Sequence, residues 1–421
     1  MENPPSALRD WAHLPTVAVQ LISEKVKSIT DFVRFRAVCL PWRSASLPQP
    51  HHLPPQLPWL MIPYYPDPED TYRGNKKDDG IRLFYDLWQS KMHKLHLPET
   101  IGKMCCASYR GWLVLVATRG TEVLLLNPLT RAHIQLPPFT TPVKVFGVDK
   151  EDCQFEASYW FEPYIGNFVI SKLSFSTDLT DPNCLIMVFL QRTCRIFFCR
   201  VGDTCWTMVN MQPREIKNTE FADATYHDGQ FYLLSHEGVL RVYHLNDPGR
   251  RLVHSFPQEL QSVTKILLEG KSGVYVVVVR QTEGEDGGEE AVAQEDQDDP
   301  SDDTKEGTEE GPKQKIELYQ LLEQSLGIRQ ITDTSNTTIF YGDNHHCLAV
   351  CSDDWDLLRG GCMYMEYVCA PSAGKDKGEA CYGIYFTKLD DGKSKLVVRD
   401  LGERPRLWPA APAMWFQPSF V

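Results

Sequence analysis

The sequence has no apolar run long enough to cross a membrane and no charged-then-apolar signal at its N-terminus. Its longest aliphatic run, VYVVVV at residues 274–279, is far shorter than the about 20 residues of a spanning helix. The first residues, MENPPSALRDWAHLP, are polar and rich in proline. These two absences predict a soluble protein of the cytoplasm, the nucleus or both, with no membrane partner.

Paired cysteine motifs are also missing, although the chain contains 13 cysteines. An odd number of scattered cysteines without a secretory signal predicts reduced thiols rather than a disulfide framework. The strongest metal candidate is HHCLAVC at residues 345–351, with Cys362 nearby. Strand alternation places Cys347 and Cys351 on one face, so buried structural thiols are the better interpretation. We expect no metal and no cofactor.

Catalytic motifs are absent as well. Gly270-Lys271-Ser272 and Gly392-Lys393-Ser394 are similar to the end of a phosphate-binding loop. Neither has the earlier glycine that such a loop needs, so both predict hairpin turns. No nucleophile elbow or HExxH pair occurs. The sequence therefore predicts a protein that is not an enzyme.

The net charge of −13 is concentrated in one segment. Residues 283–312 contain 14 acidic residues and one lysine, and without them the chain has 42 acidic and 42 basic residues. The remaining chain has no basic excess that would indicate nucleic-acid binding. The acidic segment itself is too polar to fold. Because it separates two strand-like segments, we expect a disordered insertion in a surface loop, and a regulatory or partner-binding role remains the alternative.

Short β segments separated by turns fill the chain from about residue 79 onward. Comparable units begin near Asn183, Gly229 and Gly273, at intervals of 46 and 44 residues. A period of about 40–50 residues is typical of propeller blades, in which each small sheet must stack on its neighbours. We predict a β-propeller with an undetermined number of blades. A large β-sandwich or paired barrels is the alternative.

A small helical unit precedes the β region. Proline at residue 15 suits the first turn of a helix, and Ala18, Leu21, Ile22, Val26 and Ile29 form its predicted apolar stripe. Thr30 is the expected N-cap of a second helix, which Pro41 ends near residues 39–40, and Trp42 opens a third. The fold class is thus mainly β with a small α domain. The predicted boundaries are 1–46 for the helical domain (core 14–46), 47–78 for a proline-rich linker in which residues 59–61 could begin the first β unit, and 79–421 for the propeller.

The second helix has apolar side chains on more than one face. Phe32, Phe35, Cys39 and Trp42 form one series at helical spacing, and residues 33, 37 and 40 form a second. A helix that packs on one core needs a single stripe. Three helices within about 33 residues are also too small for a good independent core. The second series therefore predicts contact with a partner.

The segment LPTVAVQLISEKVKSITDFVRFRAVCLPWRSAS (residues 14–46) resembles an F-box. It departs from the family at Leu40-Pro41, where Lys or Arg is common, and at Ala18 and Val19, where the usual pair is Leu-Leu. The residues that match the family pattern are Leu14, Pro15, Ser28, Asp31, Arg34, Phe35, Arg36, Val38, Cys39, Trp42 and Arg43.

F-box proteins bind a Skp-family adaptor and, through it, a cullin, and so form an SCF ubiquitin ligase. The resemblance implies that one apolar series packs inside the unit and that the other meets the adaptor. An unrelated helical cap on the propeller is the alternative. The adaptor-binding residues that the resemblance implies are Leu14, Pro15, Ile22, Val33, Phe35, Arg36, Val38, Cys39 and Trp42.

The β region resembles the domain that follows many plant F-boxes in SKIP- and KIB-type proteins. The resemblance rests on LLLNPLTRAHIQLPP (124–138), GIYFTK (383–388) and MWFQPSF (414–420). It implies a kelch-like propeller that recruits a protein substrate for ubiquitination; a close link to KIB-type proteins would make a kinase a candidate. The alternatives are an F-box protein that acts outside the ligase and a propeller that binds a small molecule. Aromatic residues that could line a substrate face are better interpreted as core or blade packing; they are Trp112, Trp160, Phe161, Trp206, Trp355 and Trp408. No substrate-binding residue can be named from the sequence.

Overall fold

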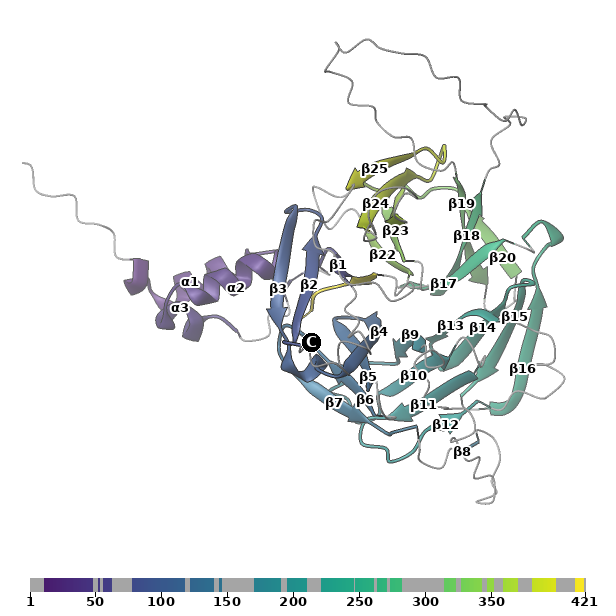
Figure 1. The fold of residues 1–421 in the computed structure, drawn as a ribbon, viewed down its shortest axis with the longest axis horizontal. Helices are drawn as coiled ribbons and strands as arrows, with labels where there is room; N and C mark the ends of the chain where they lie inside the picture. Colours follow the sequence, from purple (N-terminus) through teal and green to yellow (C-terminus); the bar gives the residue numbers. More distant parts are fainter. Residues whose placement is uncertain are drawn as a thin grey trace, which may run out of the picture.

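The computed structural model contains a helical unit beside a ring of six β-sheets (Figure 1). Within its described residues, no helix is long and apolar enough to cross a membrane. The acidic segment lies outside them. The structure describes residues 11–47, 52–53, 56–62, 78–117, 122–139, 144–145, 170–190, 195–209, 221–245, 247–260, 263–270, 273–281, 314–322, 327–342, 347–351, 359–369, 381–398 and 413–419.

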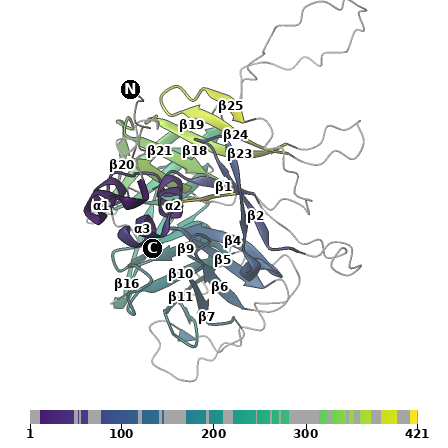
Figure 2. The ribbon, with the colours of Figure 1, turned by 90° about the vertical axis from the view of Figure 1, so that its left-hand side faces the viewer.

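Three short helices, α1 (Thr16–Ser23), α2 (Ile29–Ala37) and α3 (Leu40–Ala45), follow the 3₁₀ turn η1 (Trp11–His13). We call residues 14–46 the helical unit. It packs beside the sheets at one point of the ring (Figures 1 and 2).

The ends of the helices differ from the sequence prediction. The N-cap of α2 is Ser28 rather than Thr30, because the Ser28 side chain accepts the backbone N–H of Asp31 at 3.4 Å. The first helix ends at Ser23, so Ile29 belongs to α2 and not to the stripe of α1. Helix α3 begins at Leu40 rather than at Trp42, since proline is accepted in a first turn.

Each sheet is one blade, and its first-named strand lies nearest the axis. Blades 1 to 3 are built in the following spatial order. Blade 1 contains β26 (Met414–Phe416), β1 (Trp59–Ile62), β2 (Ile81–Asp86) and β3 (Lys91–His96); blade 2 contains β4 (Lys103–Tyr109), β5 (Trp112–Ala117), β6 (Val123–Leu126) and β7 (His133–Leu136); blade 3 contains β9 (Ile170–Phe175), β10 (Leu185–Leu190), β11 (Arg195–Arg200), β12 (Thr207–Met208) and β8 (Lys144–Val145).

Blades 4 to 6 continue the ring, and two further 3₁₀ turns, η2 (Pro98–Thr100) and η4 (Gln258–Leu260), lie in connections. Blade 4 contains β13 (Phe221–His227), β14 (Gln230–Ser235), β15 (Val239–His244) and β16 (Asp247–Ser255); blade 5 contains β17 (Thr264–Gly270), β18 (Gly273–Gln281), β19 (Gln314–Leu322) and β20 (Gly327–Ile331); blade 6 contains β22 (Cys347–Cys351), β21 (Thr337–Tyr341), β23 (Cys362–Cys369), β24 (Cys381–Lys388) and β25 (Ser394–Val398).

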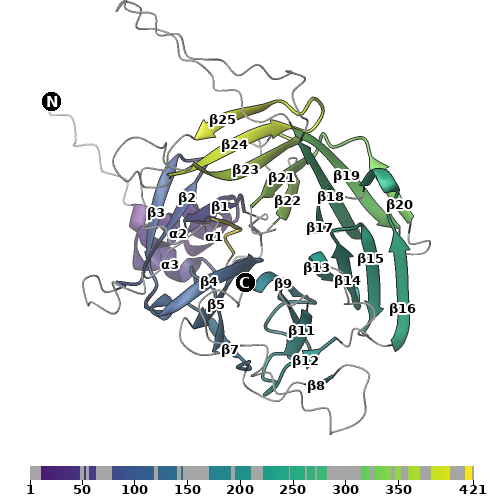
Figure 3. The ribbon, with the colours of Figure 1, turned by 45° about the vertical axis from the view of Figure 1, so that its right-hand side comes forward.

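The ring closes by pairing the two ends of the propeller. The C-terminal strand β26 is antiparallel to β1, with Leu60 opposite Trp415, and it is the inner strand of blade 1. Figure 3 shows β26 near the centre of the ring. The segment predicted as a linker, residues 47–78, thus contains a buried strand of blade 1, as was anticipated for residues 59–61.

Six apolar clusters hold the ring together, and each comprises residues of two neighbouring blades. The cluster between blades 1 and 2, for example, joins Trp59 and Phe416 to Leu113. Because each blade buries both faces against its neighbours, the sheets cannot be stable singly. The propeller prediction is confirmed, the sandwich alternative is wrong, and the number of blades is six.

Candidate functional site

The helical unit has a very small core of its own. Val19, Phe35 and Ala45 are buried, and Leu14 and Trp42 pack against them. The rings of Phe35 and Trp42 are 4.6 Å apart, and the Trp42 indole N–H donates to the Trp11 carbonyl at 3.0 Å. Each helix therefore contributes one buried apolar side chain to the contact that holds the three helices together.

Many of the other apolar side chains in and beside the unit are exposed to solvent. Of the thirteen large hydrophobic side chains that are exposed in the described ranges, eight lie between residues 11 and 47. We call them the apolar face. A concentration of exposed large apolar side chains on a small folded unit is typical of an interaction site. The apolar face consists of Trp11, Val17, Leu21, Ile22, Val33, Val38, Leu40 and Leu47.

The structure divides the predicted adaptor-binding residues into two groups. Pro15, Ile22, Val33 and Val38 are exposed, and the last three belong to the apolar face. Phe35, only 8% exposed, is an internal core residue, so it supports the surface from below rather than forming it. The partly buried residues are Leu14, Arg36, Cys39 and Trp42.

Sequence reasoning missed Val17 and misplaced Leu21. It assigned Leu21 and Ile22 to the inner stripe of the first helix, but the buried side of α1 is Val19 and Ser23. The i, i+4 spacing of these two residues gives the orientation of the helix, and Val17 and Leu21 have the same spacing on the exposed side. The signal was present, but two apolar stripes on one short helix do not reveal which one is inside.

The helical unit carries a basic excess. Residues 24–43 contain five basic and two acidic side chains, and the pair between Arg34 and Asp31 is exposed. Burial and, after it, the charge of Arg43 lower the pKa of the Arg36 guanidinium from its usual value. This basic excess favours a partner surface that carries acidic residues.

The helical unit is joined to the propeller by apolar packing and an amide. Ile29 inserts into the cluster between blades 1 and 2, and Phe32 is fully buried. The Gln56 side chain accepts the Ile29 N–H at 2.7 Å and donates to the Lys27 carbonyl at 3.0 Å. The Gln56 carbonyl in turn accepts a hydrogen bond from the Gln417 side chain at 3.1 Å. The chain end after β26 thus both closes the propeller and contacts the residue that holds α2.

A second candidate surface lies where inner strands of the propeller end. Glu269, at the end of β17, accepts a hydrogen bond from Tyr109 of β4 and pairs with Arg110 at 3.3 Å. His227 of β13 lies 3.6 Å from the same carboxylate. Burial and then the charge of Glu269 raise the pKa of Tyr109 above its usual value. Residues of blades 2, 4 and 5 thus meet in one charged cluster on the propeller axis.

The comparisons with known proteins agree with this architecture. The model of the KIB1-4 beta-propeller family matches residues 84–386. The chain belongs to this family.

Relatives in Arabidopsis thaliana extend the similarity beyond the propeller. The F-box protein SKIP23 is 24% identical over 427 residues, which span 96% of this chain and 95% of that protein. The F-box protein At3g56470 is 24% identical over 240 residues, which span 55% of this chain and 53% of that protein. The resemblance to plant F-box proteins with a KIB-type propeller is thereby confirmed.

Among solved structures, TolB from Acinetobacter baumannii is similar to this chain at 10% identity and a TM-score of 0.40, over 86% of this chain and 66% of that one. The assignment of six blades in this KIB1-4 family member rests instead on its own sheet topology.

Several cysteines of the propeller are buried packing residues, and one of them is Cys362, which was considered with the metal candidate at residues 345–351. Cys184, Cys199 and Cys362 are buried, and burial raises the pKa of Cys362 to about 11. In the described part of the chain, no group of three His, Cys, Asp or Glu side chains has metal-site geometry. His345 and the side chains of Cys347 and Cys351 lie outside the described set.

The aromatic residues that were considered for a substrate surface divide similarly. Trp112 and Trp206 are buried between blades 2 and 3, so they pack the ring rather than line a surface. The other candidates, Trp160, Phe161, Trp355 and Trp408, lie outside the described residues. The turn at Gly392 joins β24 to β25, which agrees with the hairpin interpretation of its Gly-Lys-Ser sequence.

Proposed function

We propose that this protein is the substrate-recognition subunit of an SCF-type ubiquitin ligase. The apolar face binds a Skp-family adaptor and, through it, a cullin, and the propeller recruits a protein substrate. The observation that carries the proposal is the apolar face, on a unit that matches the F-box pattern and in a chain whose full-length relative is named an F-box protein. The protein acts as a non-catalytic adaptor in the cytoplasm, the nucleus or both.

The apolar face is large enough to support stable binding. Removing one Val, Leu or Ile side chain from water contributes about 1.5–3 kcal/mol. A partner groove that covers four of the eight exposed side chains would gain on the order of 5 kcal/mol, which offsets part of the association cost of about 4–15 kcal/mol, so stable binding needs most of the face to be covered. Helices that present such residues commonly bind in a hydrophobic groove of the partner.

The contacts at Gln56 give this arrangement a fixed geometry. Because Ile29 and Phe32 are buried at the propeller and Gln56 bonds to both sides of the junction, the helical unit is not a freely tethered module. A bound adaptor would then hold the propeller in one orientation. Fixed orientation suits a receptor that must present its substrate to a transferring enzyme on another subunit.

Co-purification with a Skp-family adaptor and a cullin tests the proposal. The variant Val33→Lys/Val38→Lys places two charges on the apolar face. Its matched control is Val253→Lys/Val397→Lys on the propeller, because Val38 and Val253 are both 57% exposed. We expect the wild type and the control to retain both partners and the face variant to lose them.

Circular dichroism and melting of all three proteins verify that the helical unit stays folded. Retention of adaptor and cullin at the wild-type level by the folded face variant would contradict the proposed role of the apolar face.

A further inference from the structure

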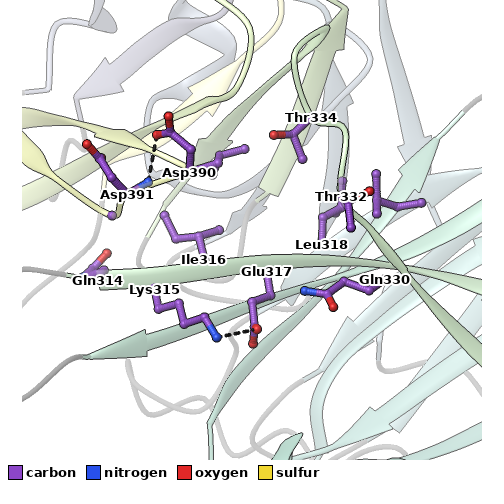
Figure 4. A pocket seen from close by; sticks show the side chains of 13 residues that line it. Gln314, Lys315, Ile316, Glu317, Leu318, Gln330, Thr332, Thr334, Asp390 and Asp391 are labelled. Atoms are coloured by element: carbon purple, nitrogen blue, oxygen red, sulfur yellow. Dashed lines mark hydrogen bonds and ion pairs between the residues drawn. The ribbon is translucent and has the colours of Figure 1, made fainter.

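A cavity of about 680 Å³ lies on the outer part of the propeller between blades 5 and 6. We call it the outer groove. It is bounded by β19, by the end of β20 and the residues after it, and by the β24–β25 turn (Figure 4). Ligand sites commonly have volumes of about 300–1,000 Å³. The groove is distant from the apolar face, which lies at blade 1.

Strand alternation gives the groove an apolar floor. Ile316 and Leu318 face blade 6, and Ile331 of β20 and Leu389 after β24 pack beside them. Lys315 lies on the opposite side of β19 with Glu317, whose carboxylate pairs with Lys315 at 2.9 Å and with Arg280 at 3.0 Å (Figure 4). Lys315 and Glu317 also line the cavity, but their charges are paired with each other and with Arg280, and Ile316 and Leu318 supply its aliphatic surface.

The rim of the groove is held in place by a close backbone contact. The Gln314 N–H donates to the Gly392 carbonyl at 3.4 Å. Gly392 has a φ of 66°, and a Cβ at this position would collide with the Gln314 carbonyl oxygen. Glycine is thus required for the turn to approach β19 this closely. The contact fixes Asp390 and Asp391 at the mouth of the groove.

The polar atoms around the floor are mainly acceptors. Asp390 accepts the Asp391 N–H at 2.8 Å, and Asp391 accepts the Lys393 N–H at 2.9 Å. The Lys393 ammonium is 3.7 Å from Asp391 and 79% exposed, so it neutralises little, and the charge of Lys388 also acts on this carboxylate. The Gln314 side-chain oxygen is buried and has no hydrogen-bond partner within the described residues.

We propose that the outer groove binds a lysine- or arginine-bearing segment of a partner protein. The aliphatic stem of such a side chain fits over Ile316, Leu318 and Leu389, because long basic side chains bury the stem and keep the head polar. The cationic head then meets Asp390, Asp391 and the Gln314 oxygen, which together match its donors. That the partner is the ubiquitination substrate rests on the proposed function; the binding itself does not.

The acidic segment that follows β18 also favours basic partners. Gln281 and Gln314 are opposite each other on β18 and β19, so the acidic segment joins blade 5 at the edge of the groove. With 14 acidic residues and one lysine, this segment attracts basic partners over a long range. It raises the local concentration of such partners without being part of the site.

The test is fluorescence polarisation with the full-length chain and a labelled peptide, Ser-Leu-Arg-Leu-Lys-Ser-Gly, at 150 mM NaCl. A second peptide carries citrulline and acetyl-lysine, which keep the shape and remove the charge. The groove variant is Asp390→Asn/Asp391→Asn, and the matched control is Asp178→Asn/Asp181→Asn, a pair of turn aspartates on blade 3 that also accept backbone N–H groups. Each protein is measured again with every Asp and Glu of residues 283–312 replaced by Asn or Gln.

We expect the basic peptide to bind the wild type and the control equally, and the groove variant about tenfold more weakly. The same difference should persist when the acidic segment is neutralised, and the uncharged peptide should bind weakly to all proteins. Equal affinity of groove variant and control, no binding by the wild type, or loss of binding only on neutralising the segment would each overturn the proposal. Because no adaptor or cullin is present, none of these results tests the ligase role. A failed co-purification would likewise not contradict binding at the outer groove.

Discussion

The helical unit and the propeller differ in where they place their apolar side chains. In the propeller, six clusters between neighbouring blades bury nearly every large aliphatic and aromatic residue of the described strands. In the helical unit, three residues are buried in its own core, whereas six large apolar side chains of the unit, and Trp11 and Leu47 beside it, are exposed. The propeller is thus stable because it is closed, whereas the helical unit keeps surface that only another protein can cover.

The helical unit and the propeller also differ in the burial of their ion pairs. The Arg34–Asp31 pair of the helical unit is exposed, and such a pair contributes little to stability. In the propeller, the Lys172 ammonium of blade 3 is buried and donates to Asp223 of blade 4 and to the Leu267 carbonyl of blade 5, both at 2.7 Å. Asp223 also accepts the Leu267 N–H at 2.8 Å. One ammonium group therefore ties three blades together near the axis.

The largest effect is expected from breaking this network. Lys172→Met leaves the Asp223 carboxylate buried without its cation, which should lower the free energy of unfolding by about 3–5 kcal/mol. Urea unfolding followed by tryptophan fluorescence measures the loss. Lys172→Met/Asp223→Leu should recover much of it, because no unpaired charge remains. A double variant as unstable as the single one would show that packing, and not the unpaired charge, causes the loss.

A smaller and more local effect is expected in the helical unit. Phe35→Ala removes the largest buried side chain of its core and should destabilise the unit by about 3 kcal/mol. Leu40→Ser, at a position that is 76% exposed, should change stability by less than about 0.5 kcal/mol. Hydrogen exchange of α1–α3 distinguishes the two, with propeller amides as the internal reference. Equal loss of protection in both parts of the Phe35→Ala protein would mean that the unit and propeller unfold together.

The sequence was sufficient to predict the F-box resemblance, the blade period and the position of the acidic insertion between two strands. It did not reveal the inner strands. The predicted units near Asn183, Gly229 and Gly273 begin with the second strand of each blade, and β9, β13 and β17 precede them. These inner strands carry Lys172, Asp223 and Glu269, polar residues that interrupt the apolar alternation by which strands are recognised.

The candidate sites also differ in how well the sequence predicts them. Ile22, Val33 and Val38 were predicted to bind the adaptor and are exposed, because a family pattern marks positions directly. The axis cluster of Tyr109, His227 and Glu269 joins residues about 160 positions apart in the chain, and the outer groove joins blade 5 to a turn of blade 6. Sites that form only when the ring closes leave no local spacing in the sequence.

A dependence of stability on pH sharpens the contrast in charge. The Lys265 ammonium is buried in blade 5 and donates to the carbonyls of His236 and Val263, and burial lowers its pKa to about 8. The unfolded chain keeps the ordinary lysine pKa of about 10.5, so between these values the unfolded state binds more protons. Deprotonation of this group should therefore increase the free energy of unfolding as pH rises from 8 to 10.5. Below pH 8 the folded state bears the full cost of the buried charge. Urea midpoints of the wild type should rise across this window relative to Lys265→Met, in which all other titrating groups are retained. Parallel curves for the two proteins would mean that Lys265 titrates alike in the folded and unfolded states.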